Sequence, residues 1–372
     1  MLFEKRTAFV AGAVALACVG LVTLGFELHP VPAAVADLPR FPLVTALTHW
    51  DAVWYVNISR FGYWYLPNTQ SPVAFFPGYP LLIWAASQLG ANPWVAAIVL
   101  SLTCGLAAVV LFKGWADVIS GPVAARSALL VLALYPFAFY LYGVPYSDGL
   151  YLALAIGSFL ALEKRHLVWA TLLGALATGA RPMAPALVLG LLVRSIELRR
   201  ASHERLRPVD FLPTLAVAGF AAYCAYLSVR FGDALAFATV QGAPGWDQAP
   251  GWHTWLKQTW FDELLPRASP WVVLRLGGHA LVTAAALALV PSTWRRLGAG
   301  YALYVAVAVG LPALASKDFH GLGRYVLAAF PLFLTAALVL GERPRFRRAW
   351  VPASALALAG LAFLFGAGAY VA

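Results

Sequence analysis

The chain has 372 residues, of which 62% are hydrophobic and 11% are charged, and its mean hydropathy is +0.76. A soluble domain carries about 25% charged residues, so this composition excludes an ordinary soluble protein. We expect one integral membrane domain over residues 1–372. The net charge of +10 does not indicate a nucleic-acid partner, because the Lys and Arg residues form short clusters typical of cytoplasmic loops.

The first apolar run, residues 7–27, follows Lys5 and Arg6 as in a signal peptide. It lacks a small-residue cleavage motif directly before a soluble region. We therefore predict an uncleaved membrane helix with a cytoplasmic amino terminus.

Residues 28–92 are predicted to remain outside as one loop. The apolar run at 73–89 is short for a crossing and contains Pro77 and Pro80. Counting it as a crossing would also move several basic clusters to the exterior, against the usual charge asymmetry. We expect amphipathic surface helices in this loop instead.

This scheme predicts an all-α polytopic fold with about eleven membrane-spanning helices. The predicted spans are 7–27, 93–113, 125–143, 147–162, 166–180, 182–196, 210–230, 271–291, 296–315, 324–341 and 349–371. Residues 93–230 form the membrane core, 231–270 a second exterior loop, and 271–372 the carboxyl-terminal helices. The exterior side also receives a turn at 144–147 and the loop 316–323.

Asp51 is the main catalytic candidate. It lies in the run His49-Trp50-Asp51-Ala52-Val53-Trp54-Tyr55, just outside the first predicted span. From Trp50 onward the apolar residues recur at three- and four-residue spacing, as in a helix that lies along the membrane surface. A carboxylate among aromatic residues at this boundary is poorly solvated and suits a base that accepts a proton from an alcohol. Helix capping is the alternative.

Two further polar residues occur where a membrane protein seldom places them. Asp148 is at an exterior helix end in Pro145-Tyr146-Ser147-Asp148-Gly149, where it could simply cap the helix. Arg181 lies between the two short spans at 166–180 and 182–196. An ionisable residue at membrane depth is a functional candidate by default.

The exterior loop 316–323 and the start of the next span carry three basic residues, Lys317, His320 and Arg324. They could hold a phosphate through charge-assisted hydrogen bonds, or they could anchor lipid headgroups. His279 is expected to be a buried structural histidine. No Cys or His spacing predicts a zinc site, so no metal or other cofactor is expected.

The ordered motifs resemble the PIG-V family, the second mannosyltransferase of GPI-anchor assembly, and its prokaryotic relatives. The motifs that carry this resemblance are Trp50-Asp51-Ala52, Gly62-Tyr63, Ala74-Phe75-Phe76-Pro77-Gly78-Tyr79-Pro80-Leu81, Tyr146-Ser147-Asp148 and Ala177-Thr178-Gly179-Ala180-Arg181. They cover residues 49–187, and beyond residue 190 only the topology and the pair His320 and Arg324 remain similar. The family usually has Glu at the position of Asp148, and Ser-Asn-Gly where this chain has Pro182-Met183-Ala184.

The resemblance implies a GT-C membrane glycosyltransferase that takes mannose from a polyprenyl-phosphate-mannose donor. It implies that Asp51 is the base in the first exterior loop. The substrate-binding candidates are then His49, Trp50, Tyr55, Phe76, Tyr146, Asp148 and Arg181. We predict that Lys317, His320 and Arg324 hold the donor phosphate opposite Asp51 across the sugar, so that the reaction inverts configuration.

The acceptor is expected to be a lipid or glycolipid hydroxyl at the exterior face, and the location a prokaryotic plasma membrane. Two alternatives remain. The same fold could transfer another sugar from a polyprenyl phosphate, or the chain could be a lipid transporter or flippase. A transporter needs polar residues along a path between both faces, often in repeated halves, and no internal repeat is visible.

Overall fold

The computed structural model describes residues 2–33, 35, 37–248 and 250–371. Within these ranges the chain is helical and has no β-strand, as the sequence predicts. The α-helices are α1 (Leu2–Leu28), α2 (Pro42–Leu47), α3 (Asp51–Phe61), α4 (Gly78–Gln88), α5 (Pro93–Ala133), α6 (Asp148–Glu163), α7 (Leu167–Ala180), α8 (Ala184–Ala201), α9 (Ala218–Phe231), α10 (Ala236–Thr239), α11 (Trp252–Trp255), α12 (Leu265–Arg267), α13 (Pro270–Ala288), α14 (Val290–Leu297), α15 (Ala299–Ala315), α16 (Leu322–Tyr325), α17 (Pro331–Gly341) and α18 (Pro344–Gly366). Short 3₁₀-helices lie at η1 (Pro72–Ala74), η2 (Ala138–Leu141), η3 (Pro208–Val217), η4 (Val240–Gly242) and η6 (Val326–Ala328), and a π-helix at η5 (Thr259–Leu264).

Several helices are long and apolar enough to cross a membrane, which makes the chain an integral membrane protein. Five such segments occur in the described residues, namely Phe9–Leu28, Pro93–Ala133, Pro208–Phe231, Pro270–Leu297 and Pro344–Gly366. The pair Leu322–Ala328 and Pro331–Gly341, bent by 93°, makes a sixth if it is counted as one span. The predicted count of eleven is therefore not reached by length and composition. The other predicted spans coincide mostly with shorter helices, such as α7 and α15.

The predicted span at 125–143 is wrong in its second half. Helix α5 breaks at Gly121, where φ is 77°, and its second arm ends at Ala133. The following residues up to α6 contain Pro136, Gly143 and Pro145, which interrupt a helix. This irregular stretch is almost wholly buried. Irregular backbone is tolerated at membrane depth only where protein surrounds it.

The loop at residues 28–92 contains three short helices, α2, α3 and α4. Helix α4 has 11 residues, about 16 Å at 1.5 Å per residue, which is about half the thickness of a membrane core. The predicted apolar face of α3 is exposed at Trp50 and Phe61 but buried at Ile58. Its most buried positions, such as Ala52 and Val56, lie on another face, against the bundle.

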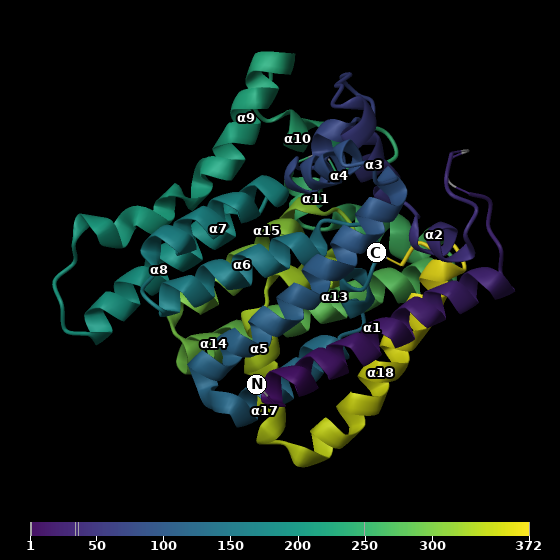
Figure 1. Ribbon diagram of the computed structural model, residues 1–372. Helices are drawn as coiled ribbons and strands as arrows, with labels where there is room; N and C mark the ends of the chain where they lie inside the picture. Colours follow the sequence, from purple (N-terminus) through teal and green to yellow (C-terminus); the bar gives the residue numbers. More distant parts are fainter. Residues whose placement is uncertain (1, 34, 36, 249, 372) are drawn as a thin grey trace.

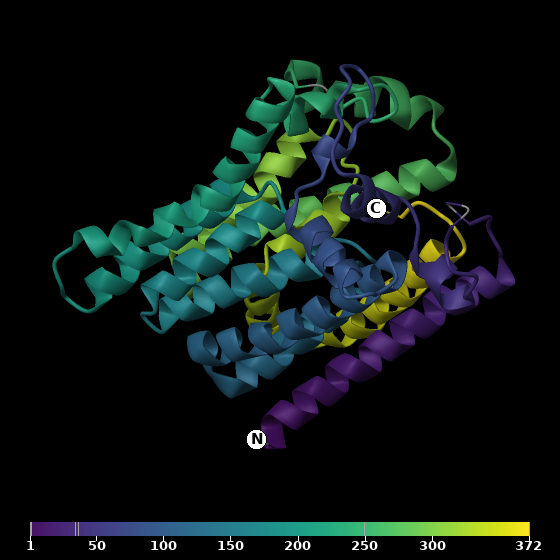
Figure 2. The ribbon, with the colours of Figure 1, turned by 45° about the horizontal axis from the view of Figure 1, so that its top comes forward.

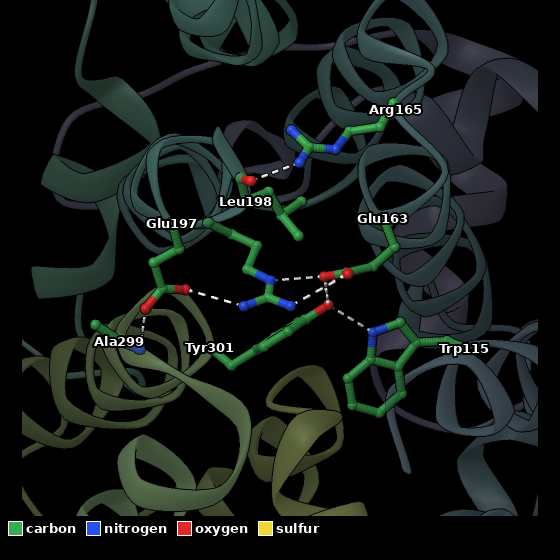
Figure 3. A network of polar contacts seen from close by, with 8 residues as sticks. Trp115, Glu163, Arg165, Glu197, Leu198, Ala299 and Tyr301 are labelled. Carbon is green, nitrogen blue, oxygen red and sulfur yellow. Dashed lines mark hydrogen bonds and ion pairs between the residues drawn. The ribbon is translucent and has the colours of Figure 1, made fainter. Parts of the chain in front are cut away.

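A network of polar contacts joins α6, α8 and α15 at the end of α6 (Figure 3). Arg194 donates from Nε to Glu163 at 2.6 Å and from Nη1 to Glu197 at 3.2 Å. The Tyr301 hydroxyl donates to Glu163 at 2.7 Å, and Glu197 also accepts from the backbone N–H of Ala299 at 2.5 Å. Because both carboxylates are bonded, we interpret this network as a structural support.

The opposite ends of α6 and α15 face the connecting loops. The loops expected on one side of the membrane do contact one another there: the N–H of Asp51 bonds to Tyr146, that of Lys317 to Gln248, and the Gln70 amide donates to the carbonyl of Pro244. Helices α3, α4, α10 and α11 gather in the upper part of Figure 1, away from the amino terminus. The view in Figure 2 also separates the amino terminus from this loop region, and the carboxyl terminus lies close to it.

Candidate functional site

Four charged side chains form a continuous chain in this loop region. Arg324 donates from Nη1 to Oδ2 of Asp51 at 2.8 Å, and its Nε lies 4.0 Å from Oδ2 of Asp148. Asp148 in turn accepts from Arg181. We call Asp51, Arg324, Asp148 and Arg181 the acid–arginine chain. It joins α3, α16 and the facing ends of α6 and α7 at one place.

The contact between Asp51 and Arg324 differs from the predicted arrangement, in which a sugar separates them. Opposite charges attract strongly where burial excludes water, so the two side chains pair directly. The members also differ in accessibility. The Asp51 side chain is 23% exposed, whereas those of Arg324 and Asp148 are 8% and 3% exposed. Of the two acids, Asp51 is therefore the one that is accessible from outside.

Local backbone geometry sets the position of Asp51. Trp50 has a positive φ of 56°, which is strained for a bulky residue and places Asp51 as the first residue of α3. The N–H of Asp51 donates to the Tyr146 hydroxyl at 3.2 Å, and that hydroxyl donates to the carbonyl of His49 at 3.2 Å. Tyr146 thus ties the turn before α3 to the irregular stretch before α6.

Aromatic rings surround the Arg324 guanidinium. Its central carbon lies 4.8 Å from the centre of the Tyr146 ring, 5.2 Å from that of Tyr325 and 5.5 Å from that of Tyr140. Such rings stabilise a cation that is largely removed from water. The Nε atom of Arg324 makes no hydrogen bond among the described residues and faces the Asp148 carboxylate at 4.0 Å.

Asp148 and Arg181 form the buried end of the acid–arginine chain. Asp148 is an acid in the first turn of α6, and its carboxylate also pairs with Arg181 and lies 4.0 Å from Nε of Arg324. Arg181 ends α7 in extended conformation, and its guanidinium carbon lies 5.5 Å from the Tyr325 ring centre. The simple capping interpretation of Asp148 is therefore insufficient.

We expect Asp148→Ala to destabilise the protein by about 3–5 kcal/mol, because it leaves Arg181 buried without its ion partner. Asp148→Asn keeps a hydrogen-bond acceptor and should destabilise less. Thermal unfolding in detergent measures both, with Asp37→Ala as the control, since Asp37 pairs with Arg60 at the surface. Equal unfolding temperatures for Asp148→Ala and the wild type would contradict a supporting role for this pair.

The three predicted phosphate-binding residues have different partners in the structure, although His320 stays within electrostatic range of Asp51 and Arg324. Arg324 lies in the acid–arginine chain, but Lys317 points its Nζ to Asp247, 3.7 Å away in the second loop. The His320 ring stacks on Tyr370, with centres 4.8 Å apart. Burial lowers the pKa of His320, which favours an uncharged ring. Of the three, only Arg324 therefore presents a cation to Asp51.

The predicted substrate-binding aromatics also occupy different places. Tyr55 shares a hydrogen bond of 2.8 Å with Ser147, next to Asp148. Trp50 is 45% exposed beside Asp51. Phe76 does not join them, because it is buried against Tyr223 in a separate aromatic cluster.

The His49 ring is buried against α18 rather than paired with the charged groups of the site. Its ring packs edge-on against Phe365, and burial lowers its pKa to about 4. An uncharged ring at neutral pH follows. It is the backbone carbonyl of His49, bonded to Tyr146, that supports the turn at Asp51.

Sequence reasoning missed several residues of the site. Tyr370 packs edge-to-face on Trp50 with centres 4.9 Å apart, and Arg275 donates to the Tyr370 carbonyl at 3.1 Å. The carboxyl-terminal segment after α18 is thereby fixed beside Asp51. Arg275 could have been found from the sequence, because it is an arginine inside the apolar run 271–291. Nothing in the sequence around Tyr370 indicates that it belongs to the site.

The fold and this site define a polytopic α-helical membrane protein with a buried acid–arginine site at one end of its bundle. Comparison with known proteins shows which family the first half of the chain resembles. The family model described as Mannosyltransferase (PIG-V) matches residues 23–197. Human GPI alpha-1,6-mannosyltransferase 2 is 31% identical over 161 residues, which cover 40% of this chain and 32% of the human protein.

Residues 23–197 are thus similar to the PIG-V mannosyltransferase family, as the motifs predicted. The match spans about a third of the length of this curated relative. The match to the family model includes Asp51, Asp148 and Arg181 but ends well before Arg324. The contact between Asp51 and Arg324 brings the unmatched part of the chain to the matched part.

Proposed function

We propose that the protein is an inverting GT-C mannosyltransferase that uses polyprenyl-phosphate-mannose as donor. The acceptor is a hydroxyl of a lipid-linked or glycolipid molecule at the exterior membrane face. The observation that carries this proposal is the contact between the partly exposed Asp51 and the buried Arg324. A base and a cation side by side are the groups that transfer from a sugar phosphate requires.

The proposed reaction has one chemical step. The acceptor oxygen attacks the anomeric carbon as the bond from that carbon to the phosphate oxygen breaks. Asp51 accepts the hydroxyl proton, and the polyprenyl phosphate leaves with the bonding electron pair. Arg324, with Arg181 behind it, stabilises the charge of the leaving phosphate.

This reaction requires the ion pair between Asp51 and Arg324 to open when donor binds. The donor phosphate competes with Asp51 for Nη1 of the guanidinium, while Nε stays directed at Asp148, 4.0 Å away. Asp51 then faces the acceptor across the sugar. Attack on the face opposite the phosphate inverts configuration, so a β-linked donor gives an α-mannoside.

The exterior location of the site follows from the membrane topology that we propose. In it about eleven helices cross the membrane, the amino terminus is cytoplasmic, and the basic clusters near Arg165, Arg199 and Arg296 face the cytoplasm. The acid–arginine chain then lies at the exterior end of the bundle, next to the loop that carries α3 and α4.

A donor panel tests this function. Purified protein in lipid nanodiscs receives labelled polyprenyl-phosphate-mannose, the matching glucose and aminoarabinose donors, or GDP-mannose, each with a set of glycolipid acceptors. We expect mannose transfer from the polyprenyl donor alone. Transfer of another sugar would change the donor assignment. Movement of an intact lipid across the membrane without a new glycosidic bond would support the transporter alternative.

Activity is expected to survive EDTA. Arg324 and Arg181 supply the positive charge that neutralises the leaving phosphate, so the proposed step needs no divalent cation. Initial rates after EDTA treatment and dialysis should stay within about twofold of untreated protein. Loss of activity that Mg²⁺ or Mn²⁺ restores would contradict the proposed role of the arginines.

A further inference from the structure

Gly323, the residue before Arg324, is held on both sides by side chains from distant helices. Its N–H donates to Nδ1 of His279 at 2.8 Å, and its carbonyl accepts from the Tyr135 hydroxyl at 2.5 Å. The first bond fixes the peptide that enters Gly323, and the second fixes the peptide that leads to Arg324. Because Nδ1 accepts, the His279 ring is neutral and carries its hydrogen on Nε2.

A third contact leaves no space around this residue. A side chain on Gly323 would collide with the ring of Phe137 and with His279. These two rings pack against each other with centres 5.1 Å apart. His279 is 1% and Phe137 6% exposed, so the contact surface is rigid.

The segment that carries Arg324 needs such support. Helix α16 has four residues and is too short to be stable by itself. Together with η6 it is bent by 93° from α17. Gly321 before it has a φ of +73°, which lets the backbone turn sharply. The direction of the Arg324 side chain is therefore set by contacts made from outside the segment.

We infer that His279 and Tyr135 are positioning residues that clamp Gly323 and so aim Arg324 at Asp51 and the donor phosphate. The inference rests on the proposed function, because it deepens the role given to Arg324. The alternative is that His279 only fills and stabilises the core. The two differ in what happens to Arg324 when the hydrogen bond is lost.

A matched pair of substitutions distinguishes the effect of losing the hydrogen bond to Gly323 from the effect of changing the size of the His279 side chain. His279→Leu removes the acceptor, whereas His279→Asn keeps an oxygen near the position of Nδ1. We expect His279→Leu to lower kcat/KM for the donor about 10- to 100-fold, as misplacement of a binding group does. His279→Asn should restore activity to within about threefold of wild type. Equal losses in both variants would overturn the inference.

Tyr135→Phe tests the other half of the clamp and is mild enough to fold. It should lower kcat/KM for the donor at least about threefold. Tyr142→Phe is the control, because Tyr142 is also buried but its hydroxyl has no hydrogen-bond partner among the described residues. The same small change for Tyr135→Phe and Tyr142→Phe would contradict a clamp.

A double-mutant cycle tests whether His279 acts through Arg324. If it does, His279→Leu should lower donor kcat/KM much less in an Arg324→Lys background than in the wild type. A purely structural role predicts the same factor in both backgrounds. That result would overturn the inference.

Chemical modification supplies a readout that does not depend on sugar transfer. Phenylglyoxal should modify the buried Arg324 slowly in the wild type and at least about fivefold faster in His279→Leu, while His279→Asn stays slow. Arg60, whose side chain is 31% exposed, serves as the internal reference. If Arg324 is modified faster in His279→Leu but the wild type shows no transferase activity, the clamp is retained and the proposed function is rejected. If the wild type transfers mannose but Arg324 is modified at the same rate in His279→Leu as in the wild type, the clamp is rejected and the proposed function is retained.

Discussion

Replacing Asp51 by asparagine is expected to lower the rate of mannosyl transfer by about 10²–10⁴-fold, the usual contribution of a positioned base. Asparagine keeps the size of the side chain and an acceptor for Arg324 but cannot take up the acceptor proton. Donor binding and thermal stability should change little. Initial rates at saturating donor and acceptor, together with a donor-binding measurement, check this expectation.

Asp37→Asn is the matched control for that experiment. Asp37 lies in the same loop, pairs with Arg60 and has a side chain that is 46% exposed. Its variant should keep wild-type turnover. Near-normal turnover in Asp51→Asn would remove Asp51 from the role of base, and Asp148 would become the acid to test next.

Substitution of Arg324 is expected to act mainly on the donor. Arg324→Ala removes a buried charge that makes hydrogen bonds of about 1.5–3 kcal/mol, so KM for the donor should rise about 10- to 100-fold. Arg324→Lys keeps the charge but loses the forked geometry and should be intermediate. Steady-state kinetics with donor and acceptor varied separately distinguish these effects.

Arg60→Lys controls for a general effect of replacing arginine, since Arg60 lies at the surface of the same loop region. A change in KM for the acceptor rather than the donor would place the phosphate elsewhere. Arg181 would then be the next candidate, because it shares Asp148 with Arg324.

The helical membrane character could be predicted from sequence because apolar runs of sufficient length rarely occur outside membrane-spanning helices. The ends of the helices were harder to predict. The run 125–143 reads as one apolar span, yet the helix stops at Ala133. Hydropathy does not distinguish a helix in lipid from an irregular segment that is buried in protein.

The candidate site could be predicted residue by residue but not as an arrangement. Asp51 and Arg324 each stand out by position, and they are 273 residues apart. Their contact depends on how α3 and α16 pack, which no local pattern encodes. Lys317 and His320 lie near Arg324 in sequence, and the structure gives them other partners, Asp247 and Tyr370. Proximity in sequence therefore did not reveal which side chains these two residues contact.

The role of Gly323 illustrates the same limit. A glycine between Leu322 and Arg324 carries no signal in the sequence, and His279 reads as an ordinary core histidine. Their hydrogen bond becomes visible only once α13 lies beside α16.

The anomeric configuration of the product tests the central claim most directly. Purified protein is given β-linked polyprenyl-phosphate-mannose and a glycolipid acceptor, and the mannoside is isolated and examined by NMR. We predict an α-mannoside whose formation is lost in Asp51→Asn and retained in Asp37→Asn. A β-mannoside, or no mannoside with any polyprenyl-phosphate-mannose donor, would contradict the proposed reaction.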